Sequence, residues 1–119
     1  MDKTILYVDD EADWRAMVTV ALEAAGFTIL AVKDASEAMA KAEGVALGLV
    51  ILDLSLAGES GIMLLKFLRR NYPDAPVLLY TGLEHDEPAI LAMLDQGAHQ
   101  YLRKGSMEEL ILRVGEYFR

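Results

Sequence analysis

The chain of 119 residues contains no cysteine and has fewer basic than acidic residues. Without cysteine there is no disulfide framework, no thiolate metal site and no thiol nucleophile, so oxygen and nitrogen ligands remain. Lys and Arg number 11 against 19 Asp and Glu, which gives a formal net charge of -8. This balance disfavours direct binding to nucleic acid or to an anionic membrane surface, because both require a basic patch.

The chain also lacks a long apolar run and a secretory signal. Its uninterrupted apolar stretches, such as Leu49 to Leu52 and Ile62 to Leu65, are far shorter than the ~18 residues that a membrane helix needs. The acidic residues Asp9, Asp10 and Glu11 follow Met1 too soon to leave room for the apolar core of a signal peptide. We therefore expect a cytoplasmic protein.

Five short β-rich runs alternate with segments of helical spacing. The predicted strands are Thr4–Val8, Phe27–Val32, Leu47–Leu52, Pro76–Tyr80 and Ala98–Leu102. In the first helical segment one apolar face is traced by Trp14, Met17, Val18, Ala21 and Leu22, and Gly26 stands where a helix ends.

Capping signals mark where the later helices begin. Asp34 to Glu37 and Ser106 to Glu109 fit capping boxes that open the second and fifth helices. Ser60 precedes the third helix, which ends at Asn71 to Pro73, and Asp86 to Pro88 opens the fourth, which ends at Gly97.

The strict alternation of strand and helix predicts an α/β fold with right-handed crossovers. We predict a single domain over residues 1–119, a doubly wound five-stranded parallel sheet of strand order 2-1-3-4-5 with five helices. The continuously apolar run Leu49 to Leu52 supports this, because a central parallel strand is buried on both faces.

In such a sheet, ligands bind beyond the carboxyl ends of the strands where the winding direction reverses. For this order the reversal brings together Asp9, Asp10 and Asp53. At ~5 Å and an effective dielectric constant of ~20, each ionised pair repels by about 3 kcal/mol. A hard divalent cation offsets that cost, and Mg²⁺ prefers oxygen ligands and binds phosphate with its remaining positions.

Two further residues at strand ends suit a phosphoryl group. Lys104 supplies a positive charge and Thr81 a hydroxyl on the other side of the crevice. Asp53 then stands where a nucleophile belongs.

These residues, in this order, resemble the receiver domain of bacterial two-component response regulators over essentially the whole chain. The family carries an acidic pair after the first strand, a phosphoaccepting aspartate after the third, Ser or Thr after the fourth, and an aromatic residue three before a lysine. In this sequence those positions are Asp9 and Asp10, Asp53, Thr81, Tyr101 and Lys104.

The resemblance implies that Asp53 takes a phosphoryl group from a sensor histidine kinase or a phosphotransfer protein. It implies Mg²⁺ on Asp10, Asp53 and the backbone carbonyl of Ser55, with Asp9 acting mainly through metal-bound water. Thr81 and Lys104 would hold the phosphoryl oxygens. Movement of Thr81 and a new Tyr101 rotamer would shift an equilibrium that a downstream protein or output domain senses.

The chain departs from the family pattern beside the lysine. Gly105 replaces the usual proline, whose bond to the lysine is often cis, and a cis bond without proline costs ~2.5–4 kcal/mol. Either the Lys104–Gly105 bond is cis despite that cost, or it is trans and the freedom of glycine places the Lys104 ammonium differently. We predict weaker positioning of Lys104 and slower phosphorylation. The loop Ser55 to Gly61 also lacks the proline usual four residues after the phosphoacceptor.

Less specific interpretations remain open for some of these residues. Tyr101 is equally typical of a core aromatic, and Trp14 and the six methionines suit helix faces and core filling. His85 and His99 have no metal-ligand or triad spacing and are expected at the surface.

The rival function is a receiver-like module that docks a partner without being phosphorylated. Gly105 and the altered loop after Asp53 favour it. Because Met1 leads directly into the first strand, we expect the domain to begin its polypeptide. It is then either a stand-alone regulator or one cut before an output domain.

Overall fold

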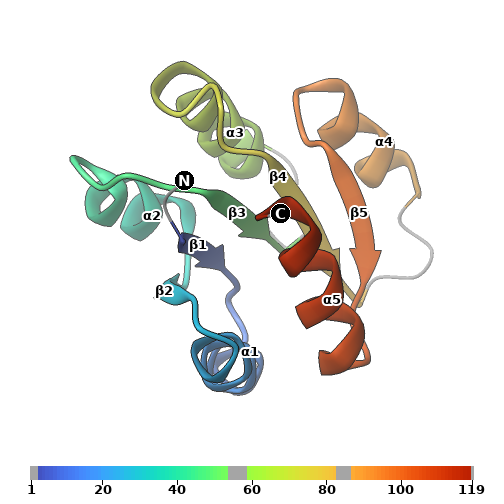
Figure 1. Ribbon diagram of the computed structural model, residues 1–119. Helices are drawn as coiled ribbons and strands as arrows, with labels where there is room; N and C mark the ends of the chain where they lie inside the picture. The colour runs from blue at the N-terminus through green and yellow to red at the C-terminus, as the bar shows by residue number, and fades with distance from the viewer. Residues whose placement is uncertain (1–2, 54–58, 83–86, 119) are drawn as a thin grey trace.

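The computed structural model describes residues 3–53, 59–82 and 87–118, in which five strands alternate with five helices (Figure 1). The strands are β1 (Thr4–Val8), β2 (Thr28–Val32), β3 (Leu49–Leu52), β4 (Val77–Thr81) and β5 (Gln100–Arg103). The helices are α1 (Ala12–Ala24), α2 (Ala35–Ala42), α3 (Glu59–Asn71), α4 (Glu87–Asp95) and α5 (Met107–Tyr117). Within these ranges, no helix has the length and hydropathy of a membrane span.

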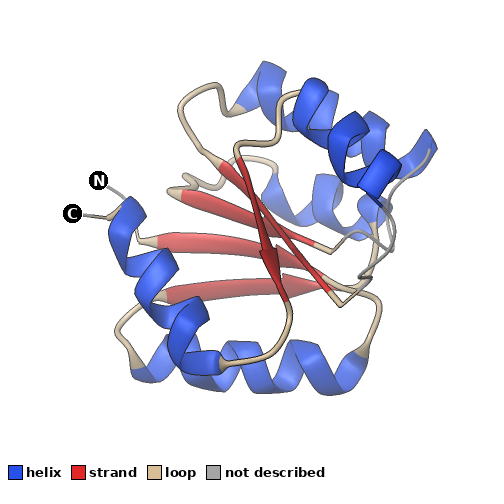
Figure 2. Ribbon diagram, turned by 90° about the vertical axis from the view of Figure 1, so that its right-hand side faces the viewer, coloured by secondary structure: helices blue, strands red, loops and turns tan. Residues whose placement is uncertain are grey.

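The strands form one parallel sheet in the order β2-β1-β3-β4-β5, which confirms the predicted topology. Helices lie on both faces of this sheet (Figure 2). All four residues of β3, Leu49 to Leu52, are therefore fully buried. Because β1 and β3 are neighbours, the winding direction reverses between them, and their carboxyl ends meet at one place.

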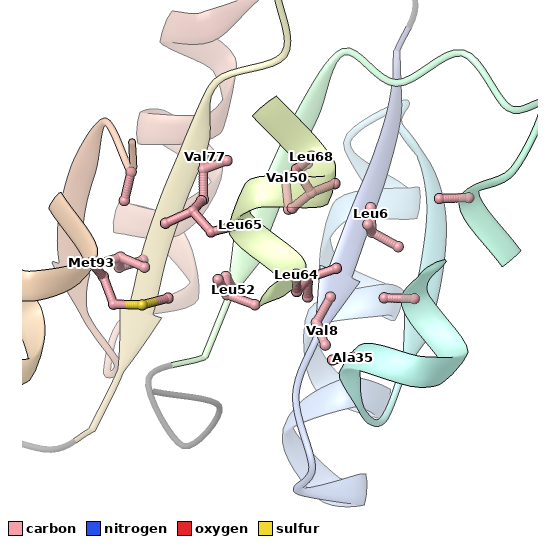
Figure 3. Close-up of a cluster of buried hydrophobic side chains, with 14 of the residues drawn as sticks. Leu6, Val8, Ala35, Val50, Leu52, Leu64, Leu65, Leu68, Val77 and Met93 are labelled. Atoms are coloured by element: carbon pink, nitrogen blue, oxygen red, sulfur yellow. The ribbon is translucent and has the colours of Figure 1, made fainter. Parts of the chain in front are cut away.

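The alternation of side chains along the strands divides the core into two layers. The layer beneath α1 and α5 receives Ile5, Tyr7, Val18, Leu22, Leu49, Ile51, Leu78, Tyr80, Leu102, Leu110 and Val114. The layer beneath α2, α3 and α4 contains, among others, Leu6, Val8, Ala35, Val50, Leu52, Leu64, Leu65, Leu68, Val77 and Met93 (Figure 3). Packing in both layers fixes the strands, and with them the positions of the polar residues at the carboxyl ends of the strands.

Local signals begin α2 and α5 and end α1 as predicted. The Asp34 side chain accepts the N–H of Glu37 at 2.8 Å, and Ser106 Oγ accepts the N–H of Glu109 at 3.2 Å. Gly26 follows α1 with φ of +100°, a left-handed conformation that side chains other than glycine rarely adopt.

Some predicted boundaries differ from those observed. β3 begins at Leu49 rather than Leu47. β4 extends through Thr81, because its carbonyl accepts the N–H of Lys104 at 2.8 Å and thereby continues the pairing with β5. The expectation that Ser60 precedes α3 is wrong, since the helix begins at Glu59, an acidic residue favoured in a first helical turn. Met17 is 47% exposed, so the buried face of α1 is narrower than its apolar spacing predicted.

Candidate functional site

The carboxyl edge of the sheet gathers the buried polar residues. Among the described residues these are Asp9, Asp53 and Thr81, exposed by 0%, 2% and 0%. Main-chain hydrogen bonds extend the parallel pairing beyond the strands: the N–H of Asp53 donates to the carbonyl of Val8 at 2.9 Å. The N–H of Asp9 donates to the carbonyl of Val32 at 3.0 Å. These bonds fix the backbone from which the carboxylates project.

The Lys104 ammonium lies between three carboxylates. Its Nζ is 2.7 Å from Asp9 Oδ2, 3.1 Å from Asp53 Oδ2 and 3.4 Å from Glu11 Oε1. The side chains of Lys104, Asp9 and Asp53 are exposed by only 4%, 0% and 3%. One ammonium therefore faces an excess of negative charge in a largely buried place, which strengthens both attraction and repulsion.

Asp9 is held at every oxygen atom. Its Oδ2 accepts a hydrogen bond from the Tyr7 hydroxyl at 2.5 Å in addition to the Lys104 contact, and its Oδ1 accepts the N–H of Glu11 at 2.9 Å. Its main-chain carbonyl accepts a hydrogen bond from Arg15 Nη1 at 2.7 Å. With its carboxylate already occupied by protein donors, Asp9 suits contact with a cation through water rather than directly.

The pKa values of the two buried carboxyl groups, Asp9 and Asp53, are shifted in opposite directions. Burial raises the pKa of Asp53, and the adjacent Asp9 carboxylate raises it further, against the attraction of Lys104. Burial acts upward on the pKa of Asp9 too, but hydrogen bonds from Lys104, Tyr7 and the N–H of Glu11 outweigh it and hold that pKa below its ordinary value. Asp53 is therefore the carboxylate whose charge is least well compensated.

The same contacts shift the pKa values of the two side chains that donate to Asp9. Burial lowers the pKa of Lys104, but its bonds to Asp9 and Asp53 outweigh burial and raise that pKa above the ordinary value. Burial and the hydrogen bond to Asp9 raise the pKa of the Tyr7 hydroxyl. Lys104 therefore stays charged and Tyr7 stays a donor at neutral pH.

The predicted acidic cluster forms and contains one more member than expected. Carboxylate oxygens of Asp9, Asp10, Glu11 and Asp53 all lie within 4.8 Å of one another. Asp10 and Glu11 are exposed, whereas Asp9 and Asp53 are buried, so the cluster is open to solvent on one side. An all-oxygen donor set of this kind suits a hard divalent cation such as Mg²⁺.

Trp14 contacts the site, which the expectation of simple core filling missed. Lys104 Nζ lies 5.0 Å from the centroid of the Trp14 ring, a cation–π distance, and the ring meets Tyr80 edge to face at 6.0 Å. The Lys104–Gly105 peptide bond is trans, because the described residues contain no cis bond. Trp14 and the carboxylates thus hold the ammonium without a proline ring beside it.

The remaining predicted residues have different outcomes. Tyr101 is half-buried and packs against the layer beneath α2, α3 and α4, consistent with a core aromatic. His99 is exposed, as expected, and its Nδ1 accepts the N–H of Val77 at 3.0 Å. Ser55 and His85 lie outside the described residues.

Known proteins resemble this chain along almost its whole length. The family model described as response regulator receiver domain matches residues 5–115. The phosphate regulon transcriptional regulatory protein PhoB of Pseudomonas aeruginosa is 38% identical over 120 aligned positions, which cover 98% of this chain and 52% of that protein. The chain thus spans about half the length of such curated relatives.

Solved structures agree with this similarity. A response regulator from Thermotoga maritima superposes with a TM-score of 0.85 at 26% identity, covering 98% of both chains. The chemotaxis protein CheY4 of Vibrio cholerae superposes with a TM-score of 0.86 at 27% identity, covering 98% of this chain and 99% of that one.

Proposed function

This chain belongs to the response regulator receiver domain family, and from this premise we propose that it accepts a phosphoryl group on the Asp53 carboxylate. The observation that carries the proposal is the position of Asp53: 2% exposed, at the carboxyl edge, with its Oδ2 3.1 Å from Lys104 Nζ. A carboxylate oxygen of Asp53 attacks the phosphorus of a phosphohistidine. The P–N bond breaks, the imidazole leaves and gains a proton, and an acyl phosphate remains.

Asp10 and Asp53 would hold Mg²⁺ together with the backbone carbonyl of Ser55, and Asp9 would contact it through water. The oxygen donors within 4.8 Å of one another support this assignment. When bound, Mg²⁺ supplies positive charge to the phosphoryl oxygens. Lys104 and Thr81 supply the protein's own share, an ammonium and a hydroxyl for oxygens that carry negative charge in the transition state.

Phosphorylation then shifts an equilibrium between two conformations of the domain. In this proposal Thr81 moves toward the phosphoryl group, and Tyr101 changes rotamer beside it. A sensor histidine kinase or phosphotransfer protein in the cytoplasm supplies the phosphoryl group, and a downstream protein or output domain senses the changed surface. The greater length of relatives such as PhoB supports an output domain. Gly105 favoured the alternative of docking without phosphorylation, but Trp14, Asp9 and Asp53 contact the Lys104 ammonium without a proline beside it, which supports phosphorylation instead.

The proposal is tested by intact mass after incubation with acetyl phosphate. We expect the wild-type chain to gain one phosphoryl mass with Mg²⁺ and none with EDTA, and Asp53→Asn to gain none in either condition. Asp95→Asn, at the exposed end of α4, is the matched control and should gain the same mass as wild type. Absence of any gain in wild type, when a known receiver is labelled alongside it, contradicts the proposal.

A further inference from the structure

Tyr7 connects the hydrophobic core to the site. Its ring belongs to the layer beneath α1 and α5 and is 0% exposed, yet its hydroxyl donates to Asp9 Oδ2 at 2.5 Å. Side chains two residues apart on a strand point to the same face, so Asp9 continues the row of Ile5 and Tyr7. The tyrosine therefore reaches the carboxylate from inside the protein, on a side that solvent does not reach.

The Tyr7 hydroxyl and the Lys104 ammonium share one oxygen of Asp9. Lys104 Nζ is 2.7 Å from the same Oδ2, whereas Oδ1 accepts the N–H of Glu11. Lys104 Nζ also pairs with Asp53 Oδ2 at 3.1 Å and with Glu11 Oε1 at 3.4 Å. In this arrangement Asp9 depends on Lys104 for charge and on Tyr7 for a neutral donor.

This sharing matters when Asp53 carries a phosphoryl group. The new oxygens require the Lys104 ammonium, which must then give up part of its contact with Asp9. A buried carboxylate that loses a donor is strongly destabilised unless another donor remains. Tyr7 is the side-chain donor that stays in place, because its ring is anchored in the core.

We propose that Tyr7 is a positioning residue that satisfies Asp9 while Lys104 transfers to the phosphoryl group, so that the transfer costs less. This inference rests on the proposed function of Asp53. Tyr7 acts through Asp9 and touches neither the phosphoryl group nor the metal. Without its hydroxyl, Asp9 holds Lys104 more tightly, and phosphorylation slows.

Tyr80 provides a matched control for Tyr7→Phe. It is 0% exposed, lies in the same layer on β4, and its hydroxyl donates to no carboxylate among the described residues. Tyr80→Phe therefore removes a buried hydroxyl without removing a donor to a carboxylate. Any effect of losing a hydroxyl from this layer as such appears in both variants.

The experiment is a double-mutant cycle on the initial rate of phosphorylation by acetyl phosphate at saturating Mg²⁺. We expect Tyr7→Phe to be about tenfold slower than wild type, because hydrogen bonds to charged groups are strong, and Tyr80→Phe to stay within about twofold. In a Lys104→Met background, Tyr7→Phe should add less than about twofold, because no ammonium remains to be released. Equal rates for the two Tyr variants, or a tenfold effect that persists without Lys104, overturn the inference.

A second readout separates positioning from general damage. Trp14 is the single tryptophan and lies 5.0 Å from Lys104 Nζ, so its fluorescence reports Mg²⁺ binding beside it. We expect Tyr7→Phe to leave the Mg²⁺ dissociation constant within about threefold of wild type while the rate falls about tenfold. A parallel loss of Mg²⁺ affinity and rate instead indicates a structural role only.

A crystal structure of the wild-type chain with Mg²⁺ and beryllofluoride tests the same idea without a variant. The expected result is Lys104 Nζ on a fluorine atom and Tyr7 still bonded to Asp9; a Tyr7 hydroxyl turned away from Asp9 contradicts the inference. The two proposals fail differently. A wild-type chain that takes up no phosphoryl group overturns the function and this inference with it, whereas a labelled wild type with an equally fast Tyr7→Phe overturns this inference alone.

Discussion

The two faces of the sheet bury apolar side chains, whereas its carboxyl edge, one residue beyond Leu52, buries charge. Leu52 and Leu68 are 0% exposed within a continuous apolar layer, while Asp53 and Asp9 are exposed by 2% and 0%. Burial of the leucines stabilises the fold by roughly 1.5–3 kcal/mol each. Burial of the carboxylates costs free energy that Lys104 only partly offsets, because it faces several carboxylates at once. The apolar faces of the sheet thus stabilise the fold, whereas the carboxyl edge keeps buried charges that are incompletely compensated.

The largest expected effect comes from the apolar face. Leu68→Ala should lower the free energy of unfolding by about 2–5 kcal/mol, because it leaves a cavity between α3 and the sheet. Leu112→Ala, at a position 65% exposed on α5, should change it by less than about 0.5 kcal/mol. Urea denaturation measures both. The folded Leu68→Ala protein should still be phosphorylated. Loss of phosphorylation would mean that the reactivity of the carboxyl edge depends on packing in the apolar layer.

Removal of the shared ammonium should come next. Lys104→Met should cost about 2–3 kcal/mol at pH 7 in EDTA, because Asp9 and Asp53 stay buried without their cation. The pKa of Lys104 is raised on folding, so its contribution is complete below the unfolded-state value of 10.5 and is lost as pH rises through the folded-state value. Wild type should therefore lose stability at high pH relative to the variant. A difference between the two proteins that stays constant as pH rises above 10.5 would contradict the pairing.

Asp53→Asn should do the opposite and stabilise the metal-free protein, by on the order of 1 kcal/mol at pH 7. The pKa of Asp53 is raised on folding, so the wild type is favoured when this carboxyl is protonated and penalised as pH rises through the folded-state value. The difference between the proteins should vanish below pH 3.8, the ordinary value. Thermal unfolding in EDTA at several pH values measures it, and a less stable variant at pH 7 would refute the cost assigned to the edge.

The smallest effect concerns the loop after β5. Gly105→Pro should speed phosphorylation by acetyl phosphate about two- to fivefold, because proline restricts the backbone beside Lys104. Gly105→Ala is the control: a Cβ at this position meets nothing within 4 Å, so alanine fits and tests the loss of glycine's freedom alone. A rate unchanged by proline would show that Trp14 and the carboxylates already position the ammonium.

Strand order and site location were predictable from the sequence because both follow from local patterns. β-rich runs alternating with helical segments fix a parallel sheet, and the polar residues at strand ends must then meet at one edge. Asp9, Asp53 and Lys104 do meet there. Boundaries were less predictable, because hydrogen bonds between strands, such as Lys104 N–H to Thr81, decide where pairing stops.

The unpredicted contacts depend on packing between distant elements. Trp14 on α1 meets Lys104 after β5, and no local pattern indicates that a helix face and a loop 90 residues later touch. Glu11 directly follows Asp9 and Asp10 in the sequence, but its contact with Lys104 likewise joins distant elements. Tyr7 did carry a signal: it stands two residues before Asp9 on a strand, so its hydroxyl had to point toward the same face as the carboxylate.

Locating the phosphoryl group tests the central claim most directly. After reaction with acetyl phosphate and Mg²⁺, borohydride reduces an acyl phosphate to an alcohol with loss of phosphate, which converts a modified aspartate to homoserine. Peptide mass spectrometry then identifies the residue. We predict homoserine at position 53 and at no other aspartate. Homoserine at Asp9 or Asp10 with Asp53 unchanged would contradict the assignment of Asp53 as the phosphoacceptor.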